Sequence, residues 1–214
     1  MKRHIKRYAA PAAWHIQRKT TMFVSKPRPG PHPLATSMPL SLWLIQLGFA
    51  KTQKEARFIL KTKQVIVDGK RAKKTDLAVG LFDILSIPDT KTSYVVQLNT
   101  KGQLYLMPTT ASEKICKILG KKTLGKEYQL SLSSGRTARI TDNNYHVHDS
   151  VTLSLSNNTI TKHLPLRPGA NTALISGKHV GNKGIIERIE GQKVWCRIGE
   201  NIIETRKQLV CVIP

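Results

Sequence analysis

The chain has 214 residues, of which 35 are lysine or arginine and 13 are aspartate or glutamate, so its formal net charge is +22. This excess of positive charge indicates a polyanionic partner, with RNA as the first candidate, although charge alone does not separate RNA from DNA or an anionic membrane. Aromatic residues make up only 6% of the chain, which argues against one large core and favours two or three small domains.

Cysteine usage and hydropathy exclude further classes of protein. Cys116, Cys196 and Cys211 are odd in number and form no Cys-x-x-Cys pair, which argues against a disulfide framework or a zinc site and favours buried thiols in a reducing compartment. The longest apolar run, residues 38–50, is shorter than the roughly 20 residues of a membrane span. Residues 9–16 are too short and too interrupted for the hydrophobic part of a secretory signal. We therefore expect a cytoplasmic protein with no membrane partner.

Residues 1–37 are predicted to form an extended basic arm, because four alternating prolines between residues 27 and 33 fix φ and remove backbone donors. Ten lysines and arginines precede the first acidic residue, Glu55. A disordered tail is the alternative, but apolar residues such as Trp14 and Phe23 would anchor the arm. We expect the arm to be ordered on a partner and partly disordered in the isolated chain.

Two helices are predicted at the start of the next block, residues 38–89. The first begins at Pro39, repeats apolar residues at intervals of three and four, and ends at Gly48. The second opens at Thr52, whose Thr-x-x-Glu spacing to Glu55 is a capping box. The inward face of this second helix carries Ala56, Ile59 and Leu60, and its outward face carries Lys54, Arg57 and Lys61.

A hairpin is predicted after these helices. An Asp-Gly turn at positions 68–69 follows a strand over residues 64–67, and the return strand begins with Lys70 and Arg71. Residues 81–87 predict a closing strand, after which a Pro-Asp turn ends the block. The block therefore has the order of elements of a small helix-helix-hairpin domain.

Residues 90–168 are predicted to form a central β-rich domain, because their hydropathy alternates mostly with a period of two. Hairpins are expected over residues 94–107 and 128–140, with further strands over residues 151–163. A second capping box predicts a short helix that begins at Thr110. This region carries no pattern that indicates chemistry.

Residues 169–214 are predicted to form a compact barrel of short strands joined by tight turns. Its first loop, residues 177–184, is rich in glycine and lysine, and Gly181 and Gly184 would permit backbone turns that side chains obstruct. A plain barrel turn is the alternative to a nucleic-acid or ribosomal-protein contact, and the lysines favour the contact. The fold class expected for the whole chain is therefore α+β, mostly β.

The stripe of Lys54, Arg57 and Lys61 is either a solvated helix face or a contact surface for RNA. An ordinary solvated face mixes both signs of charge, whereas this helix offers Glu55 as its one acid. We therefore favour contact with RNA, mostly through phosphates, which position a protein without reading bases.

The order of elements in residues 38–87 resembles the small RNA-binding domain of the ribosomal S-four type, which also occurs in pseudouridine synthases and tyrosyl-tRNA synthetases. The resemblance rests on the buried first helix, the Thr-x-x-Glu-Ala-Arg start of the second helix and the Val-Ile-Val-Asp-Gly-Lys hairpin. The loop at residues 177–184, Gly-Lys-His-Val-Gly-Asn-Lys-Gly followed by two isoleucines, is similar to a KOW motif.

Essentially the whole chain resembles the e-type S-four family of the archaeal and eukaryotic small ribosomal subunit, and is nearest to archaeal members. Besides the two blocks above, the resemblance rests on Lys-Arg-His-Ile-Lys-Arg-Tyr-Ala-Ala-Pro, the proline run, Met-Pro-Leu, Phe-Asp-Ile-Leu-Ser-Ile and Thr-Lys-Gly, which occur in this order. It implies a structural, non-catalytic constituent of the small ribosomal subunit, with small-subunit rRNA and neighbouring ribosomal proteins as partners.

Signatures of enzymes are missing from the sequence, which contains no Walker loop, dinucleotide fingerprint, His-Glu-x-x-His or nucleophile elbow. An RNA-modifying enzyme would need a larger catalytic domain with a placed acid. His146 and His148 lack the further ligands of a zinc site, and we expect them on the surface. We expect no cofactor, metal or small-molecule substrate. A transcription or translation regulator that carries a KOW module and binds RNA off the ribosome is the alternative function.

The residues expected to contact RNA are basic side chains of the arm, of the first folded domain and of the glycine-lysine loop. In chain order they are Lys2, Arg3, Lys6, Arg7, Arg18, Lys19, Lys26, Arg28, Lys54, Arg57, Lys61, Lys63, Lys70, Arg71, Lys178, His179 and Lys183.

Overall fold

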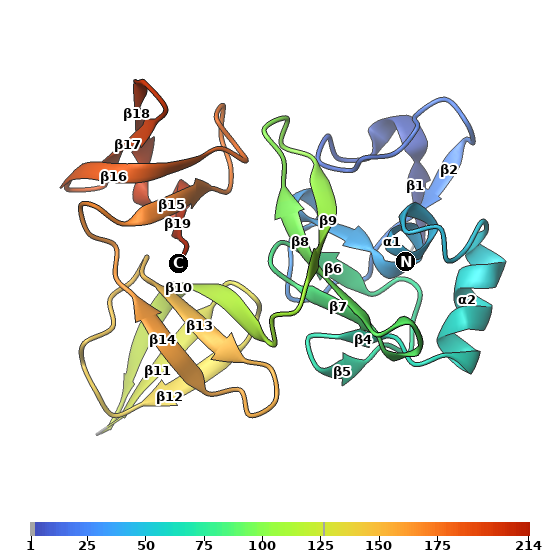
Figure 1. Ribbon diagram of the computed structural model, residues 1–214, viewed down its shortest axis with the longest axis horizontal. Coiled ribbons are helices and arrows are strands. Elements are labelled where there is room, and N and C mark those ends of the chain that lie inside the picture. The colour runs from blue at the N-terminus through green and yellow to red at the C-terminus, as the bar shows by residue number, and fades with distance from the viewer. Residues whose placement is uncertain (1–2, 126) are drawn as a thin grey trace. The chain divides into compact units, whose positions relative to one another are not determined.

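A computed structural model describes residues 3–125 and 127–214, and within them the chain is mostly β, with two α-helices (Figure 1). The fold class expected from the sequence is confirmed at this level. The chain divides into two compact units. Unit 1 runs to Gln97 and includes Gln103–Ala111, whereas unit 2 consists of Leu98–Gly102 and Ser112–Pro214.

The N-terminal segment of unit 1 is folded, which differs from the expected extended arm. Strand β1 (His4–Lys6) pairs antiparallel with β2 (Phe23–Ser25), and a 3₁₀ helix, η1 (Arg7–Ala9), follows β1. The Trp14 side chain is buried, and its indole Nε1 donates a hydrogen bond to the Ser37 carbonyl at 2.7 Å. The Trp14 anchor therefore packs within the chain itself.

The proline run also packs against unit 1. The Arg28 backbone N–H donates to the Asp76 carbonyl at 2.8 Å, and the Arg28 guanidinium forms an ion pair with the Asp76 carboxylate. His32 Nε2 lies 2.8 Å from Asp83 Oδ1, with both side chains buried. A Cβ added to Gly80 would lie 2.4 Å from the His32 ring. Backbone and side-chain contacts with residues 76–83 therefore hold a segment whose prolines cannot donate backbone hydrogen bonds.

Both predicted helices are confirmed. Helix α1 (Leu40–Gln46) begins after Pro39, and the chain leaves it through Gly48 at φ 78°. Helix α2 (Gln53–Thr62) has Thr52 as its N-cap, whose Oγ1 accepts from the Glu55 N–H at 3.2 Å. The Glu55 carboxylate accepts from the backbone N–H of Lys51 at 2.7 Å, so the cap reaches one residue further back than the expected capping box.

Strands β3 (Ser37–Pro39) and β6 (Ala78–Gly80) form a separate antiparallel pair. A five-stranded sheet, called the unit 1 sheet, follows the helices, and the order of its strands is β5-β4-β7-β8-β9. The predicted Asp-Gly turn is confirmed, since Asp68 and Gly69 adopt φ values of 50° and 76°. The bounds of the five strands are β4 (Ile66–Val67), β5 (Lys70–Arg71), β7 (Ile84–Ile87), β8 (Thr92–Leu98) and β9 (Leu104–Thr109).

The sheet crosses the boundary expected between residues 89 and 90. Strand β7 pairs with β8 through a short 3₁₀ turn, η3 (Pro88–Thr90), from Ile84↔Val95 to Ile87↔Thr92. The Pro-Asp signal is therefore a hairpin turn within one sheet, and it ends no folding unit.

Unit 2 contains a central sheet of five antiparallel strands in the order β12-β11-β10-β13-β14. Its core consists of Cys116, Ile118, Leu130, Leu132, Val151 and Leu153. The helix expected from Thr110 is wrong, because Glu113 begins a strand that pairs with β13 and then, past a bulge after Ile118, with β11. The strand bounds are β10 (Glu113–Leu124), β11 (Glu127–Leu132), β12 (Thr137–Ile140), β13 (Ser150–Ser154) and β14 (Ile160–Leu164).

The C-terminal sheet of unit 2 has the order β18-β17-β16-β15-β19, and all its pairs are antiparallel. Leu174, Ile186, Val194, Cys196 and Val210 form its core. A 3₁₀ helix, η4 (Lys207–Leu209), precedes the last strand. The strand bounds are β15 (Asn171–Leu174), β16 (Lys183–Glu190), β17 (Lys193–Ile198), β18 (Asn201–Arg206) and β19 (Val210–Val212).

All three cysteine side chains are buried, as expected. Burial raises the pKa of the Cys211 thiol to about 11, so the thiol stays protonated and packs as a small apolar group. Within the part of the chain that the structure describes, no helix has the length and hydropathy needed to cross a bilayer.

Candidate nucleic-acid interface

Helix α2 presents the predicted basic stripe to solvent. Lys54, Arg57 and Lys61 are exposed, whereas Ala56 and Leu60 on the opposite face are buried. The single acid of the helix, Glu55, is fully exposed, and the hydrogen bond from the Lys51 N–H lowers its pKa. Because Glu55 is held at the N-cap, the three cations form a surface of one sign along the helix.

Phe58 lies on the same side of α2 and was not identified from the sequence. Its side chain is 66% exposed, although it stands between Arg57 and the half-buried Ile59. Residues four apart share a helix face, so Phe58 follows Lys54 by one turn. The sequence does contain evidence for this exposure, because Phe58 is not on the predicted inward face of the helix, which carries Ala56, Ile59 and Leu60. An exposed ring among cations is typical of surfaces that stack unpaired bases.

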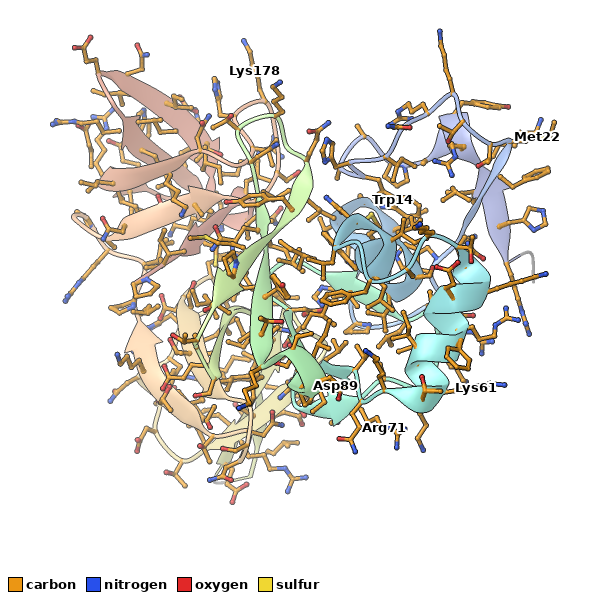
Figure 2. All side chains as sticks on the ribbon, turned by 45° about the vertical axis from the view of Figure 1, so that its right-hand side comes forward. Trp14, Met22, Lys61, Arg71, Asp89 and Lys178 are labelled. Atoms are coloured by element: carbon orange, nitrogen blue, oxygen red, sulfur yellow. The ribbon has the colours of Figure 1, made fainter. Side chains whose placement is uncertain are left out.

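The β4–β5 hairpin extends this basic surface. Lys70 and Arg71 are exposed on β5, which is the edge strand of the unit 1 sheet. Figure 2 shows Lys61 at the end of α2 and Arg71 on the hairpin at the same edge of unit 1. The ammonium of Lys63, between them in sequence, lies 3.8 Å from the Asp89 carboxylate, so this cation is partly neutralised within the protein.

The basic residues of the N-terminal segment divide into two groups. Arg3, Lys6 and Lys19 are exposed, and Lys26 is half-buried. Arg7, Arg18 and Arg28 make structural contacts in addition, which sequence reasoning did not anticipate. Lys2 lies outside the described residues.

Two arginines hold the loop between β1 and β2 by donating to backbone carbonyls. The Arg7 guanidinium donates to the Gln17 carbonyl at 2.8 Å. The Arg18 guanidinium donates to the carbonyls of Tyr8 and Ala10 at 2.9 and 3.1 Å. Carbonyls that receive charged donors need no other partner, so these arginines order a loop that has no regular structure beyond η1.

The glycine-lysine loop exposes Lys178 and Lys183, and His179 is half-buried. Gly181 has a φ of 83°, and a Cβ there would lie 1.8 Å from the Asn99 carbonyl oxygen. Gly184 has no positive φ, and its added Cβ would lie 2.3 Å from the Arg197 carbonyl oxygen. Gly181 is therefore required for its turn conformation, as expected. Gly184 is instead required because the backbone of β17 lies so close to it that a side chain would clash.

These contacts separate a structural role of the loop from a binding role. We expect Gly181→Ala to destabilise unit 2 by about 2 kcal/mol, because the Cβ meets backbone and φ is positive. The paired change Lys178→Ala with Lys183→Ala removes two exposed cations and should leave the melting temperature unchanged while reducing incorporation into small subunits. Thermal melts and subunit pulldowns measure the two effects. A stable and fully incorporated lysine variant would show that the loop is structural.

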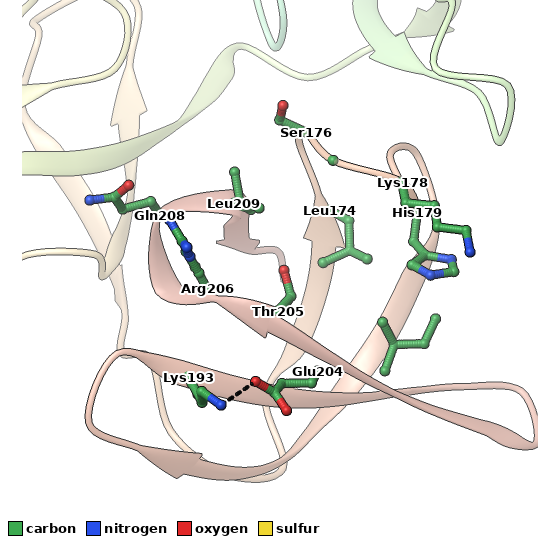
Figure 3. Close-up of a pocket in the computed structure, with 12 residues that line it drawn as sticks. Leu174, Ser176, Lys178, His179, Lys193, Glu204, Thr205, Arg206, Gln208 and Leu209 are labelled. Carbon is green, nitrogen blue, oxygen red and sulfur yellow. Dashed lines mark ion pairs between the residues drawn. The ribbon is translucent and has the colours of Figure 1, made fainter.

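A cleft of about 670 Å³ adjoins this loop on the C-terminal sheet (Figure 3). Leu174 and Leu209 supply apolar walls, and Lys178, His179 and Arg206 supply basic groups. The ammonium of Lys193 lies 2.7 Å from a Glu204 carboxylate oxygen within the lining. Lys178 and His179, two of the predicted RNA contacts, therefore meet at one opening.

A buried lysine links the two sheets of unit 2 and was also missed from the sequence. Lys117 of β10 is 2% exposed, and its Nζ donates to the carbonyls of Lys207, Gln208 and Val210 at 2.6, 2.9 and 2.5 Å. Burial lowers the pKa of Lys117 from its ordinary value of 10.5 to about 8. In sequence this lysine is indistinguishable from a surface one.

Replacing this lysine tests its structural role. Lys117→Met should destabilise unit 2 by about 1–3 kcal/mol, because three carbonyls lose their donor. The folded chain releases this proton near pH 8 and the unfolded chain near 10.5, so Lys117 makes stability rise with pH between these values. Chemical denaturation at pH 7, 8.5 and 10 should show a smaller rise in the variant. Parallel curves for the two proteins would contradict the assigned pKa.

Among the residues that the structure describes, no group of three His, Cys, Asp or Glu side chains is arranged to hold a metal. His146 is exposed, as expected, whereas His148 is half-buried with a φ of 81°. Desolvation, followed by the charges of Lys117 and Lys207, lowers the pKa of His148. Asp149 accepts from the His146 N–H and binds His163 Nε2 at 2.8 Å, which ties this loop to β14.

Known proteins resemble this chain along nearly its whole length. The RS4NT (NUC023) domain model matches residues 1–35, and the model of ribosomal family S4e matches residues 90–160. Small ribosomal subunit protein eS4 of Methanocella arvoryzae is 40% identical, covering 98% of this chain and 93% of that protein. The protein of the same name from Methanocaldococcus jannaschii is 36% identical over 91% of this chain and 84% of its own length.

A solved structure agrees with these relatives. The crystal structure of 30S ribosomal protein S4e from Thermoplasma acidophilum superposes with a TM-score of 0.70 at 29% identity, covering 83% of this chain and 94% of that one. The strongly basic, mostly β fold is thus that of an archaeal type of ribosomal protein. The chain belongs to ribosomal family S4e.

Proposed function

We propose that this protein is a structural, non-catalytic constituent of the small ribosomal subunit that binds rRNA. The observation that carries the proposal is the exposed, one-signed surface formed by Lys54, Arg57 and Lys61 in a chain 40% identical to a protein named for that subunit. Its partners would be small-subunit rRNA and neighbouring ribosomal proteins, within cytoplasmic ribosomes.

The mechanism is neutralisation of closely spaced phosphates. Lysines and arginines displace the counterions that condense on RNA, so the affinity falls steeply as salt rises. Helix α2 and the β4–β5 hairpin are rigid elements, and they fix the distances between their cations. Contacts of this kind position a protein on RNA by its shape and phosphate pattern.

The four predicted parts are retained as a proposal. Residues 38–89 would be the RNA-binding domain of the S-four type, now with residues 90–111 added to its sheet, and residues 1–37 a basic segment packed against it. The rest of residues 90–168 would form the central domain, and residues 169–214 a KOW barrel of SH3 type. Five antiparallel strands and the close approach at Gly184 support the last assignment.

The proposal is tested by sedimentation. An epitope-tagged chain expressed in an archaeal host should comigrate with small subunits in a sucrose gradient and stay bound through a high-salt wash. A KOW-containing regulator that acts off the ribosome would remain near the top of the gradient or leave during the wash. That outcome would replace the proposed function by the alternative.

A further inference from the structure

The β1–β2 ribbon exposes large apolar side chains beside its cations. Tyr8, Met22 and Phe23 are 69%, 71% and 47% exposed. Figure 2 shows Met22 pointing away from the body of unit 1. We call the two rings, Tyr8 and Phe23, the aromatic platform. Tyr8, Met22 and Phe23 lie outside the core, so core packing does not explain why large apolar side chains occupy these positions.

The pairing register separates two faces of the ribbon. Ile5 pairs with Val24, which is 3% exposed, so this pair faces the protein. Lys6 pairs with Phe23, and because side chains alternate along a strand this pair faces outward. The Arg7 N–H donates to the Met22 carbonyl at 2.8 Å, which continues the pairing by one residue beyond Phe23.

The outer face is arranged by contacts between rings and cations. The His4 and Phe23 rings meet edge to face, with centroids 4.8 Å apart and planes at 72°. The Lys6 Nζ lies 5.7 Å from the centre of the Tyr8 ring. Rings held by such contacts keep their orientation while a face stays open to solvent.

Charge identifies the ligand that fits this face. Residues 1–54 contain no acid, Lys6 lies beside the Tyr8 ring, and Arg3 and Lys19 are exposed in the same N-terminal segment. A ligand must therefore combine negative charge with flat apolar surface. Unpaired nucleotides supply both, since their phosphates are anionic and every base has a face that stacks on an aromatic ring.

We propose that the aromatic platform binds unpaired bases of RNA by stacking, while the neighbouring cations bind the phosphates. This inference rests on the proposed rRNA binding and deepens it, because it assigns to the ribbon single-stranded RNA in place of a duplex. In an A-form duplex the bases stack on one another, so their faces are unavailable to the platform.

The test compares one RNA sequence in two forms. The probes are a labelled single strand of about 12 nucleotides and the same strand annealed to its complement, measured by fluorescence anisotropy with the full-length protein. The variant Tyr8→Leu with Phe23→Leu keeps apolar bulk and removes both rings. We expect its affinity for the single strand to fall about tenfold, with the duplex affinity and the salt dependence unchanged.

Two matched variants act as controls. Tyr8→Phe with Phe23→Tyr keeps both rings and should bind the single strand like the native protein. Ile202→Ala changes an exposed apolar residue of unit 2 and should alter neither affinity. Thermal melts of all variants establish that the ribbon variants are folded.

Several results would overturn the proposal. An equal loss for single strand and duplex would show that the leucine variant disturbs phosphate contacts, and an unchanged affinity for both would show that the rings bind no base. Binding to vesicles of anionic phospholipid that depends on the two rings would identify a membrane face. If the native protein comigrates with small subunits while the platform fails this test, the proposed function stands and only the stacking inference falls.

Discussion

Replacing Lys54, Arg57 and Lys61 with glutamate is expected to lower affinity for small-subunit rRNA at least about 100-fold, with a change of only a few degrees in the melting temperature. The three side chains are exposed on the face of α2 opposite Ala56 and Leu60, so the core keeps its packing. Each lost phosphate contact should also reduce the slope of log affinity against log salt by about one. Filter binding over a salt series measures both quantities.

A control of equal charge separates a local contact from general attraction. Lys122, Arg139 and Lys162 are exposed on the central sheet, and reversing them changes the net charge by the same amount. We expect this control to lose much less affinity than the α2 variant. Equal losses in both proteins would show that the helix acts only through net charge, and an unchanged affinity in the α2 variant would remove α2 from the interface.

The second large effect concerns Trp14. Trp14→Ala should destabilise unit 1 by about 3–5 kcal/mol, because the change leaves a cavity where a fully buried ring packed and removes the donor to the Ser37 carbonyl. The N-terminal segment should then be released. Limited trypsin digestion should cleave the native protein slowly after Arg7 and Arg18, whose guanidiniums are held by carbonyls, and the variant quickly.

A conservative change sets the scale for this result. Trp14→Phe keeps an apolar ring and loses the Nε1 donor, so its stability should lie between those of the native protein and the alanine variant. If the native segment is cut as fast as the alanine variant, the segment is an open arm in solution, as the sequence alone predicted.

Local interactions are where sequence reasoning succeeded. Helix α2 follows from the Thr52 cap and from apolar residues three and four apart, all within ten residues. The Asp68-Gly69 turn follows from backbone preferences of the two residues themselves. The +22 charge and the one-signed stripe are fixed by composition, and the family resemblance is confirmed by the relatives.

Contacts between distant residues are where it failed. The proline run is held by Asp76 and Asp83, which lie about fifty residues further along the chain, and no local pattern announces such partners. The capping box at Thr110 was overruled because β10 gains a ladder with β13 and a buried face. The β7–β8 pairing likewise turned a predicted boundary into a hairpin.

The sequence by itself determined the charge, the helices, the tight turns and the family of this protein, because each depends on residue types or on neighbours within a few positions. Only the tertiary structure decided which cations are exposed to solvent and which make contacts that hold the fold. Lys117 and Arg18 hold carbonyls, whereas Lys54 and Lys6 face solvent beside exposed rings. The physical reason is that a cation's role depends on which acceptors surround it, and those acceptors come from segments that only folding brings together.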